Sequence, residues 1–167
     1  IRKCITDSVA KNGGHLASNL GIVEITLALF KVFNLPEDKI VYDVGHQCYV
    51  HKILTGRKDK MDTLRTYGGV AGFPKISESE YDAFSTGHAG TSLSAGLGLC
   101  TARDKLNEDY NIVNFVGDAS IFNGQNLEAI TANEVKPKKF LVLLNDNGMS
   151  INKNNNGLYK LISKITV

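Results

Sequence analysis

The chain has 167 residues, a length that suits one domain with a single core. Hydrophobic residues make up 43% of the chain and charged residues 22%, which is typical of an ordinary globular protein. The net charge of +2, with scattered lysines, gives no reason to expect a nucleic-acid partner. Glu24 and Lys31 interrupt the longest apolar stretch, so we expect no membrane span.

The cysteines and the two ends of the chain bear on the cellular setting. Cys4, Cys48 and Cys100 are an odd set with wide spacing, which does not indicate a disulfide framework and favours a reducing compartment. The first residues lack the apolar region of a signal peptide. The chain begins without Met and has no clear stop signal at its end, so we interpret both ends as cuts in a longer protein.

The first half of the chain is predicted to be mainly helical. Residues 3–11 form a possible short helix, and residues 20–33 repeat apolar side chains at helical spacing on a wide face. Residues 39–43 are typical of a short strand. Residues 49–55 and 59–65 are predicted to be short helices.

The second half contains a strand–helix–strand unit. A Gly-rich loop at 67–80 leads to a helix at 91–106, whose small residues suit close packing on a sheet. Strands are predicted at 111–116 and 139–144, with a helix at 123–134 between them. The apolar runs of these strands do not alternate, which predicts strands buried on both faces of a parallel sheet. The fold class is therefore α/β, a parallel sheet flanked by helices.

Oxygen-bearing side chains follow both predicted strands of this unit. Asp118 comes after the first strand, and Asn145, Asp146 and Asn147 come after the second. Ligands of open α/β sheets bind beyond the carboxyl ends of the strands. If the two strands are neighbours, Asp118 and one of the asparagines converge on a hard oxygen shell that suits Mg²⁺ with phosphate and water.

A phosphate site is predicted beside this metal site. The backbone N–H groups of Ala119 and Ser120 lie just before the helix and point to diphosphate binding at its N-terminus. The alternative is that the Gly-Asp and Asn-Asp-Asn-Gly segments are ordinary turns.

Three of the four histidines follow a glycine in a predicted loop. These are His15, His46 and His88, and the adjacent glycines allow the backbone to approach a ligand closely. His51 lies on a predicted helix, so we expect it to serve packing or the surface.

Other site types are less well supported. The spacing His46-x-Cys48-x-x-His51 lacks a fourth zinc ligand. The segment 87–92 suits a phosphate cradle but lacks the Gly-Lys-Ser/Thr ending of a P-loop, and no GxGxxG follows a strand.

Several segments resemble the 1-deoxy-D-xylulose-5-phosphate synthase family, in order and over nearly the whole chain. They are Gly14-His15-Leu16-Ala17-Ser18-Asn19-Leu20-Gly21, Asp43-Val44-Gly45-His46-Gln47, His51-Lys52-Ile53-Leu54-Thr55-Gly56-Arg57, Ser79-Glu80-Tyr81-Asp82 and Gly87-His88 with Thr91-Ser92. Gly117-Asp118 followed by Leu144-Asn145-Asp146-Asn147 resembles the thiamine-diphosphate motif that the family shares with transketolases.

The resemblance implies a thiamine-diphosphate-binding fold and a set of roles. Asp118, Asn147 and the carbonyl of Met149 would bind Mg²⁺, and Asn147 would also contact the cofactor. His15, with a catalytic role, and Ser18 would face the substrate. The remaining cofactor contacts would come from His46, Gly87, His88, Ala89, Ala119 and Ser120.

The resemblance also implies an activity. The family condenses pyruvate with glyceraldehyde 3-phosphate and releases CO₂, and its product feeds isoprenoid, thiamine and pyridoxal synthesis. We expect residues 1–167 to be a single diphosphate- and Mg²⁺-binding domain, without the pyrimidine-binding and C-terminal domains of the family. A homodimer, in the bacterial cytoplasm or a plastid, is implied.

Two departures from the family pattern leave alternatives open. Ala119 stands where the family motif has glycine, which matters if that position needs a positive φ or has no room for a methyl group. The family's cofactor-activating glutamate belongs to the missing pyrimidine domain, and Glu24 and Glu128 are poor substitutes because they lie within predicted helices. The alternatives are a non-catalytic thiamine-diphosphate-binding module, the N-terminal subunit of a split transketolase, and a generic nucleotide-binding domain.

Overall fold

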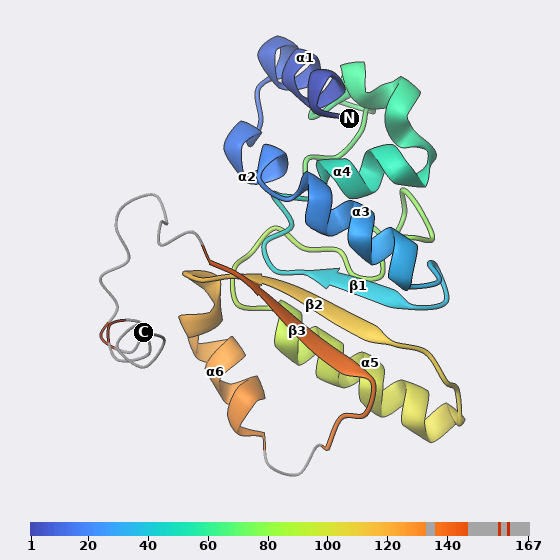
Figure 1. The fold of residues 1–167 in the computed structure, drawn as a ribbon, viewed down its shortest axis with the longest axis vertical. Helices are drawn as coiled ribbons and strands as arrows, with labels where there is room; N and C mark the ends of the chain where they lie inside the picture. Colours follow the sequence, from blue (N-terminus) through green and yellow to red (C-terminus); the bar gives the residue numbers. More distant parts are fainter. Residues whose placement is uncertain (133–135, 147–156, 158–159, 161–167) are drawn as a thin grey trace.

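The computed structural model describes residues 1–132, 136–146, 157 and 160. Short helices dominate the first part of the chain (Figure 1). They are α1 (Arg2–Asn12), α2 (Leu16–Leu20), α3 (Val23–Val32) and α4 (Tyr49–Lys52), followed by the π-helical turn η1 (Ile53–Arg57) and the 3-10 helix η2 (Lys58–Thr63). None of the helices in the described ranges combines the length and the apolar character that crossing a bilayer requires.

A three-stranded parallel sheet forms the centre of the molecule. It contains β1 (Lys39–Tyr42), β2 (Ile112–Gly117) and β3 (Phe140–Asn145) in the order β1-β2-β3. Tyr42 pairs with Phe115, and Gly117 pairs with Asn145, so the carboxyl ends of all three strands lie at one edge. The predicted α/β class, with a parallel sheet flanked by helices, is confirmed.

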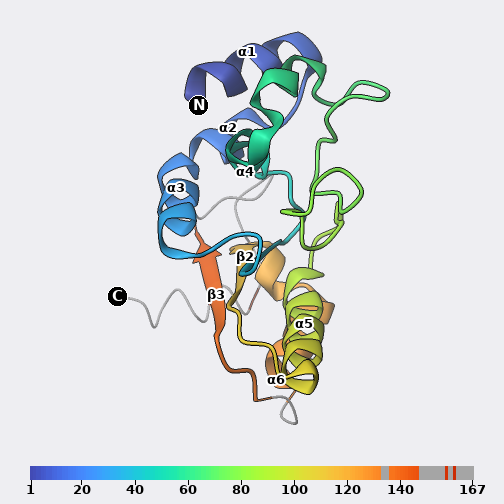
Figure 2. The ribbon, with the colours of Figure 1, turned by 90° about the vertical axis from the view of Figure 1, so that its right-hand side faces the viewer.

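Helices lie on both sides of this sheet (Figure 2). Ile40, Tyr42, Val113 and Phe115 point into the larger core, which also includes side chains of α1, α3 and α4. The opposite side chains of the strands pack on α5 (Ser92–Leu106), where Val41, Ile112 and Cys100 form a smaller core. The last helix, α6 (Gly124–Thr131), packs beside α5. Strand β2 is the middle strand and is buried on both faces, as its apolar run predicted.

The short helix predicted at 59–65 is present as the 3-10 helix η2, which follows Gly56 in a left-handed conformation with φ 85°. Two details of the predicted elements were wrong. The helix predicted at 20–33 begins only at Val23, because α2 ends at Leu20 and a turn separates the two helices. Strand β3 is not buried on both faces: it is last in the sheet, and Leu141, Val142 and Leu144 are 44%, 38% and 47% exposed.

Helix α5 approaches β2 closely at one glycine. A Cβ atom on Gly96 would lie 2.1 Å from Oδ1 of Asn114, whose side chain is fully buried and donates a hydrogen bond to the Leu141 carbonyl. Gly98 lies two residues further along the same helix, and a Cβ atom there would meet no neighbouring atom of the described residues within 4 Å. The prediction that small residues allow this helix to pack closely on the sheet is therefore confirmed.

These two glycines make a matched pair for a stability test. We expect Gly96→Ala to lower the free energy of unfolding by about 2 kcal/mol, because the added methyl group overpacks the contact with Asn114. Gly98→Ala should raise the free energy of unfolding by about 0.5–1 kcal/mol, since alanine is the better helix former. Urea denaturation of both variants measures the difference, and equal effects would contradict the close packing.

Candidate functional site

Two carboxylates lie at the ends of neighbouring strands. Asp118 directly follows β2, and Asp146 directly follows β3. The parallel register is continued past the strands by a hydrogen bond of 3.2 Å from the Asp118 N–H to the Asn145 carbonyl. Asp118 was predicted to converge with one of the asparagines of this segment, but the described residue whose charge acts on it is Asp146. Asn147 lies outside the described residues, so the pairing with an asparagine stays a prediction.

The environment of Asp118 does not favour its negative charge. The residue is 5% exposed, and its Oδ2 atom finds no hydrogen-bond donor among the residues that the structure describes. Burial raises the pKa of Asp118, and the nearby Asp146 carboxylate raises it further. Together they outweigh hydrogen bonds from the N–H groups of Ala119 and of Asp118 itself, which lower the pKa. A bound cation would satisfy the buried oxygen atom and relieve the repulsion between the two carboxylates.

The turn after Asp118 accommodates the alanine that departs from the family pattern. Ala119 has φ −74° and ψ −34°, a conformation that any residue adopts without strain. The short 3-10 helix η3 (Ser120–Phe122) follows and leads into α6. The concern that this position requires a positive φ is thereby removed.

A histidine pair lies near the same edge of the sheet. The rings of His15 and His46 have centroids 5.2 Å apart in an edge-to-face arrangement, and the Phe73 ring lies 6.0 Å from that of His15. The Nδ1 atoms of both histidines are buried without a hydrogen-bond partner in the described part of the chain. The structure thus brings together two of the three Gly-flanked histidines, each with an available polar atom.

Asn19 holds the backbones of these two histidines together. Its fully buried Nδ2 atom donates to the His15 carbonyl at 2.6 Å and to the His46 carbonyl at 2.8 Å. Its Oδ1 atom accepts a hydrogen bond from the Tyr49 N–H at 2.8 Å. Asn19 belongs to a motif segment, but sequence reasoning assigned it no role because contacts 27 and 30 residues apart leave no local signal.

Both histidines favour the neutral form. Burial lowers the pKa of His15, and the charge of Arg65 lowers it further. Burial also lowers the pKa of His46, as does the neighbouring His15, while Asp43 acts in the opposite direction. A neutral imidazole has one nitrogen that donates and one that accepts, so each ring is able to exchange a proton near neutral pH.

These shifts predict a pH dependence. His15, His46 and His51 all have lowered pKa values, so NMR titration should place their midpoints below the ordinary value of about 6.5. As the pH falls below that value, the unfolded chain binds protons that the folded chain does not. The free energy of unfolding should therefore fall as well. Midpoints at or above 6.5 for these rings would contradict the burial argument.

The third Gly-flanked histidine lies in an exposed segment. Gly87, His88 and Ala89 are exposed, and the side chains of Thr86 and Thr91 hydrogen-bond to the His88 carbonyl. The segment lies near the histidine pair, because Phe73 is the nearest neighbour of a Cβ atom built on Gly87, at 3.9 Å. The segment 87–92 was considered as a phosphate cradle. Two of its N–H groups, those of Gly90 and Ser92, are not available to a phosphate because they donate hydrogen bonds to the Asp43 carboxylate.

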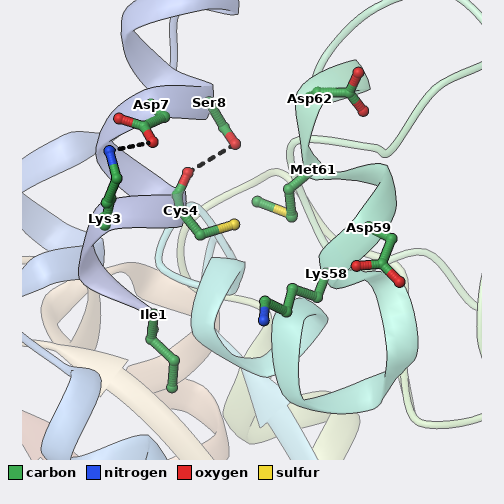
Figure 3. Close-up of a pocket in the computed structure, with 9 residues that line it drawn as sticks. All are labelled: Ile1, Lys3, Cys4, Asp7, Ser8, Lys58, Asp59, Met61 and Asp62. Atoms are coloured by element: carbon green, nitrogen blue, oxygen red, sulfur yellow. Dashed lines mark hydrogen bonds and ion pairs between the residues drawn. The ribbon is translucent and has the colours of Figure 1, made fainter.

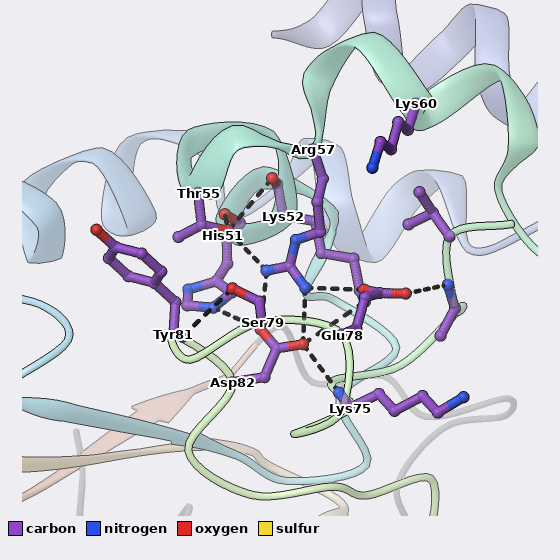
Figure 4. A network of polar contacts seen from close by, with 12 residues as sticks. His51, Lys52, Thr55, Arg57, Lys60, Lys75, Glu78, Ser79, Tyr81 and Asp82 are labelled. Atoms are coloured by element: carbon purple, nitrogen blue, oxygen red, sulfur yellow. Dashed lines mark hydrogen bonds and ion pairs between the residues drawn. The ribbon is translucent and has the colours of Figure 1, made fainter.

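A buried ionic network supports the loop that carries Phe73 (Figure 4). The Asp82 carboxylate accepts two hydrogen bonds of 2.8 Å from the Arg57 guanidinium and one of 2.9 Å from the Lys75 N–H. Glu78 accepts from Arg57, from the Ala71 N–H and from Lys52, which is fully buried. The loop backbone is thus fixed on both sides of Phe73.

His51 belongs to this network and not to the histidine pair. Its Nε2 atom lies 3.0 Å from Asp82 Oδ1, and the residue is 1% exposed. Of the two expectations for His51, packing is confirmed and a surface position is wrong. In the described residues no three His, Cys, Asp or Glu side chains come together as metal ligands, and the ring of His51 is directed to Asp82.

Breaking this network should be costly. Asp82→Asn leaves Arg57 and Lys52 buried with too little negative charge, so we expect a loss of about 3–5 kcal/mol in the free energy of unfolding. Asp62→Asn is the control, because its exposed pair with Lys11 should contribute less than about 1 kcal/mol. Urea denaturation at pH 7 compares them, and equal losses would contradict the assigned role of Asp82.

The structure gives less information on the remaining predicted site residues. Ser18 lies on α2 and is half-buried, close in sequence to His15. Asn147 and Met149, predicted to bind the metal ion, lie outside the described residues.

A separate hollow of about 490 Å³ lies between α1 and η2 and contains none of the predicted site residues (Figure 3). Its lining mixes both charge signs with Ile1, Cys4 and Met61.

Comparison with known proteins shows the family of this chain. The family model described as 1-deoxy-D-xylulose-5-phosphate synthase matches residues 1–167. The synthase of Clostridium kluyveri is 52% identical over 167 residues, covering the whole of this chain and 27% of that protein. The synthase of Syntrophomonas wolfei is 56% identical over 154 residues, covering 92% of this chain and 24% of that protein.

A solved structure gives the fold independently. A transketolase variant from Pichia stipitis superimposes with a TM-score of 0.81 at 24% identity, covering 90% of this chain and 26% of that chain. The fold is therefore that of the transketolase class. Within that class, the chain belongs to the 1-deoxy-D-xylulose-5-phosphate synthase family. It spans about 27% of the length of the curated relatives it matches.

Proposed function

We propose that this chain forms the diphosphate- and Mg²⁺-binding part of an enzyme that condenses pyruvate with glyceraldehyde 3-phosphate to 1-deoxy-D-xylulose 5-phosphate and CO₂. Family membership over residues 1–167 supports the reaction. The observation that carries the assignment within this chain is Asp118, whose buried oxygen atom lacks a donor among the described residues at the meeting point of β2 and β3.

In this proposal Asp118 is a ligand of Mg²⁺, together with Asn147 and the Met149 carbonyl. The N–H groups of Ala119 and Ser120 hold the diphosphate, and both precede α6 in an unstrained turn. Further cofactor contacts come from His46, Gly87, His88 and Ala89. When bound, thiamine diphosphate supplies a carbon nucleophile and an electron sink for the decarboxylation.

The histidine pair then has a chemical role. His15 faces the reacting centre as a neutral imidazole, with Nδ1 available to hydrogen-bond to the substrate or to exchange a proton with it. Ser18 on α2 assists substrate binding. The Phe73 ring lies beside that of His15, with ring centroids 6.0 Å apart.

Activation of the cofactor requires a glutamate from outside this site. Glu24 pairs with Arg2 on the surface, and Glu128 is exposed on α6. We therefore propose that residues 1–167 act as one domain, completed by a pyrimidine-binding domain of the same chain or of a partner in a homodimer. Because the relatives compared above are bacterial, we place the enzyme in the bacterial cytoplasm.

The same observation on the glutamates favours one second candidate, a module that binds thiamine diphosphate without catalysis. The two are distinguished by the release of labelled CO₂ from pyruvate in the presence of glyceraldehyde 3-phosphate, with the full-length protein and then with an added pyrimidine-binding domain. Release supports the synthase, and binding without release under both conditions supports the module.

Substitution of Asp118 tests the metal site. We expect Asp118→Asn to raise the dissociation constant of thiamine diphosphate at saturating Mg²⁺ by at least about tenfold, because a charged metal ligand is lost. Without cofactor, the same variant should melt at the same or a higher temperature, since the substitution removes a buried charge and its repulsion with Asp146. Calorimetric titration and thermal melting measure the two effects.

Asp109→Asn is the matched control. Asp109 is an exposed acid that pairs with Lys139 near the opposite ends of β2 and β3, so its loss should leave cofactor affinity unchanged. Equal thiamine-diphosphate affinities of the Asp118 and Asp109 variants would contradict the proposed metal site.

A further inference from the structure

The carboxylate of Asp43 is buried at the carboxyl end of β1, where it accepts hydrogen bonds from a distant loop. The residue is 1% exposed. Its Oδ1 atom accepts from the Gly90 N–H at 2.9 Å, and its Oδ2 atom accepts from the Ser92 N–H at 3.1 Å. These N–H groups lie at the N-terminus of α5, where a negative charge is favourable. The Asp43 carboxylate supplies that charge from within the protein.

Asn126 extends these contacts to a second loop. It is fully buried on α6, and its Nδ2 atom donates to Asp43 Oδ2 at 3.1 Å and to the Ser120 carbonyl at 2.9 Å. Its Oδ1 atom accepts a hydrogen bond of 3.3 Å from the Leu93 N–H. The side chain therefore joins the turn after β2 to the start of α5.

A third segment begins at Asp43 itself. Val44 has φ 58°, a left-handed conformation that is costly for a β-branched residue, and Gly45 follows with φ 82°. Gly45 packs so closely on Pro74 and Thr86 that an added Cβ atom would lie 2.3 Å from the proline ring. This tight turn presents His46, and the Gln47 side chain donates back to the Asp43 carbonyl at 3.2 Å.

We infer that Asp43 and Asn126 are positioning residues for the cofactor. Together they join the three segments 44–46, 87–92 and 118–122, which carry most of the predicted cofactor contacts. Neither side chain touches the cofactor in this assignment. They act by fixing the distances between the loops that do, so that the site is formed before the ligand arrives. The inference rests on the proposed function, because it concerns the same thiamine-diphosphate site.

The chain offers a closely matched control for Asp43 at the other end of β1. Asp38 is 8% exposed and accepts hydrogen bonds from two backbone N–H groups, those of Asn34 and Asn111, and from the Asn111 side-chain amide. Asp43 likewise accepts from two backbone N–H groups and one asparagine amide. The two carboxylates thus have the same bonding pattern, but only Asp43 lies among the predicted cofactor loops.

The test uses Asp43→Asn, Asp38→Asn and Asn126→Ala in the natural full-length protein, each below its melting temperature. Calorimetric titration with thiamine diphosphate at saturating Mg²⁺ measures affinity. We expect Asp43→Asn to raise the dissociation constant about tenfold and Asn126→Ala to raise it about threefold or more, because the loops lose fixed hydrogen bonds. Asp38→Asn should change it by less than about twofold, while lowering the melting temperature about as much as Asp43→Asn does.

The outcomes of this test distinguish failure of the proposed function from failure of the positioning role. If the unsubstituted protein does not bind thiamine diphosphate, the proposed function and this inference both fail. If it binds and Asp43→Asn has no more effect than Asp38→Asn, the proposed function stands and the positioning role is overturned. If Asp43→Asn does not fold, Asn126→Ala decides, and an affinity equal to that of the unsubstituted protein overturns the role.

Discussion

Parallel pairing of three strands is the constraint on which the site depends. Because β1, β2 and β3 run in the same direction, Asp43, Asp118 and Asp146 all lie at one edge of the sheet. A buried carboxylate is costly unless hydrogen bonds, an opposite charge or a metal ion compensate it. The way in which each carboxylate is compensated indicates whether it serves the fold or a ligand.

Asp43 and Asp118 differ in this respect. Asp43 receives three hydrogen bonds from the protein, so its charge is satisfied by the fold. Asp118 is also buried, but one of its carboxylate oxygen atoms has no hydrogen-bond donor among the described residues. This contrast supports the proposal that Asp43 positions the loops and that Asp118 binds the metal ion. The buried network around Asp82 follows the first pattern, since Arg57 and Lys52 compensate it internally.

The sequence alone predicted the parallel sheet, the acids beyond its strands and the Gly-flanked histidines, because buried strands and ligand loops have local signatures. It did not predict the roles of Asn19 and Asn126, because their contacts join residues far apart in the sequence. The Asn126 contact with Asp43, for example, joins residues 83 apart. Nor did it predict the negative φ of Ala119, because composition does not reveal a backbone angle. The exposure of β3 was missed because an apolar run shows hydrophobicity and not the presence of a neighbouring strand.

That last strand has a practical consequence. Among the described residues β3 pairs only with β2, and apolar side chains such as Leu141 and Leu144 are exposed, so its other edge is able to pair with a further strand. Since β3 ends at Asn145, beside Asp118, self-association along this edge would crowd the mouth of the ligand site. Any strand that pairs along this edge, from a second copy or from another part of a longer chain, would therefore lie beside the ligand site.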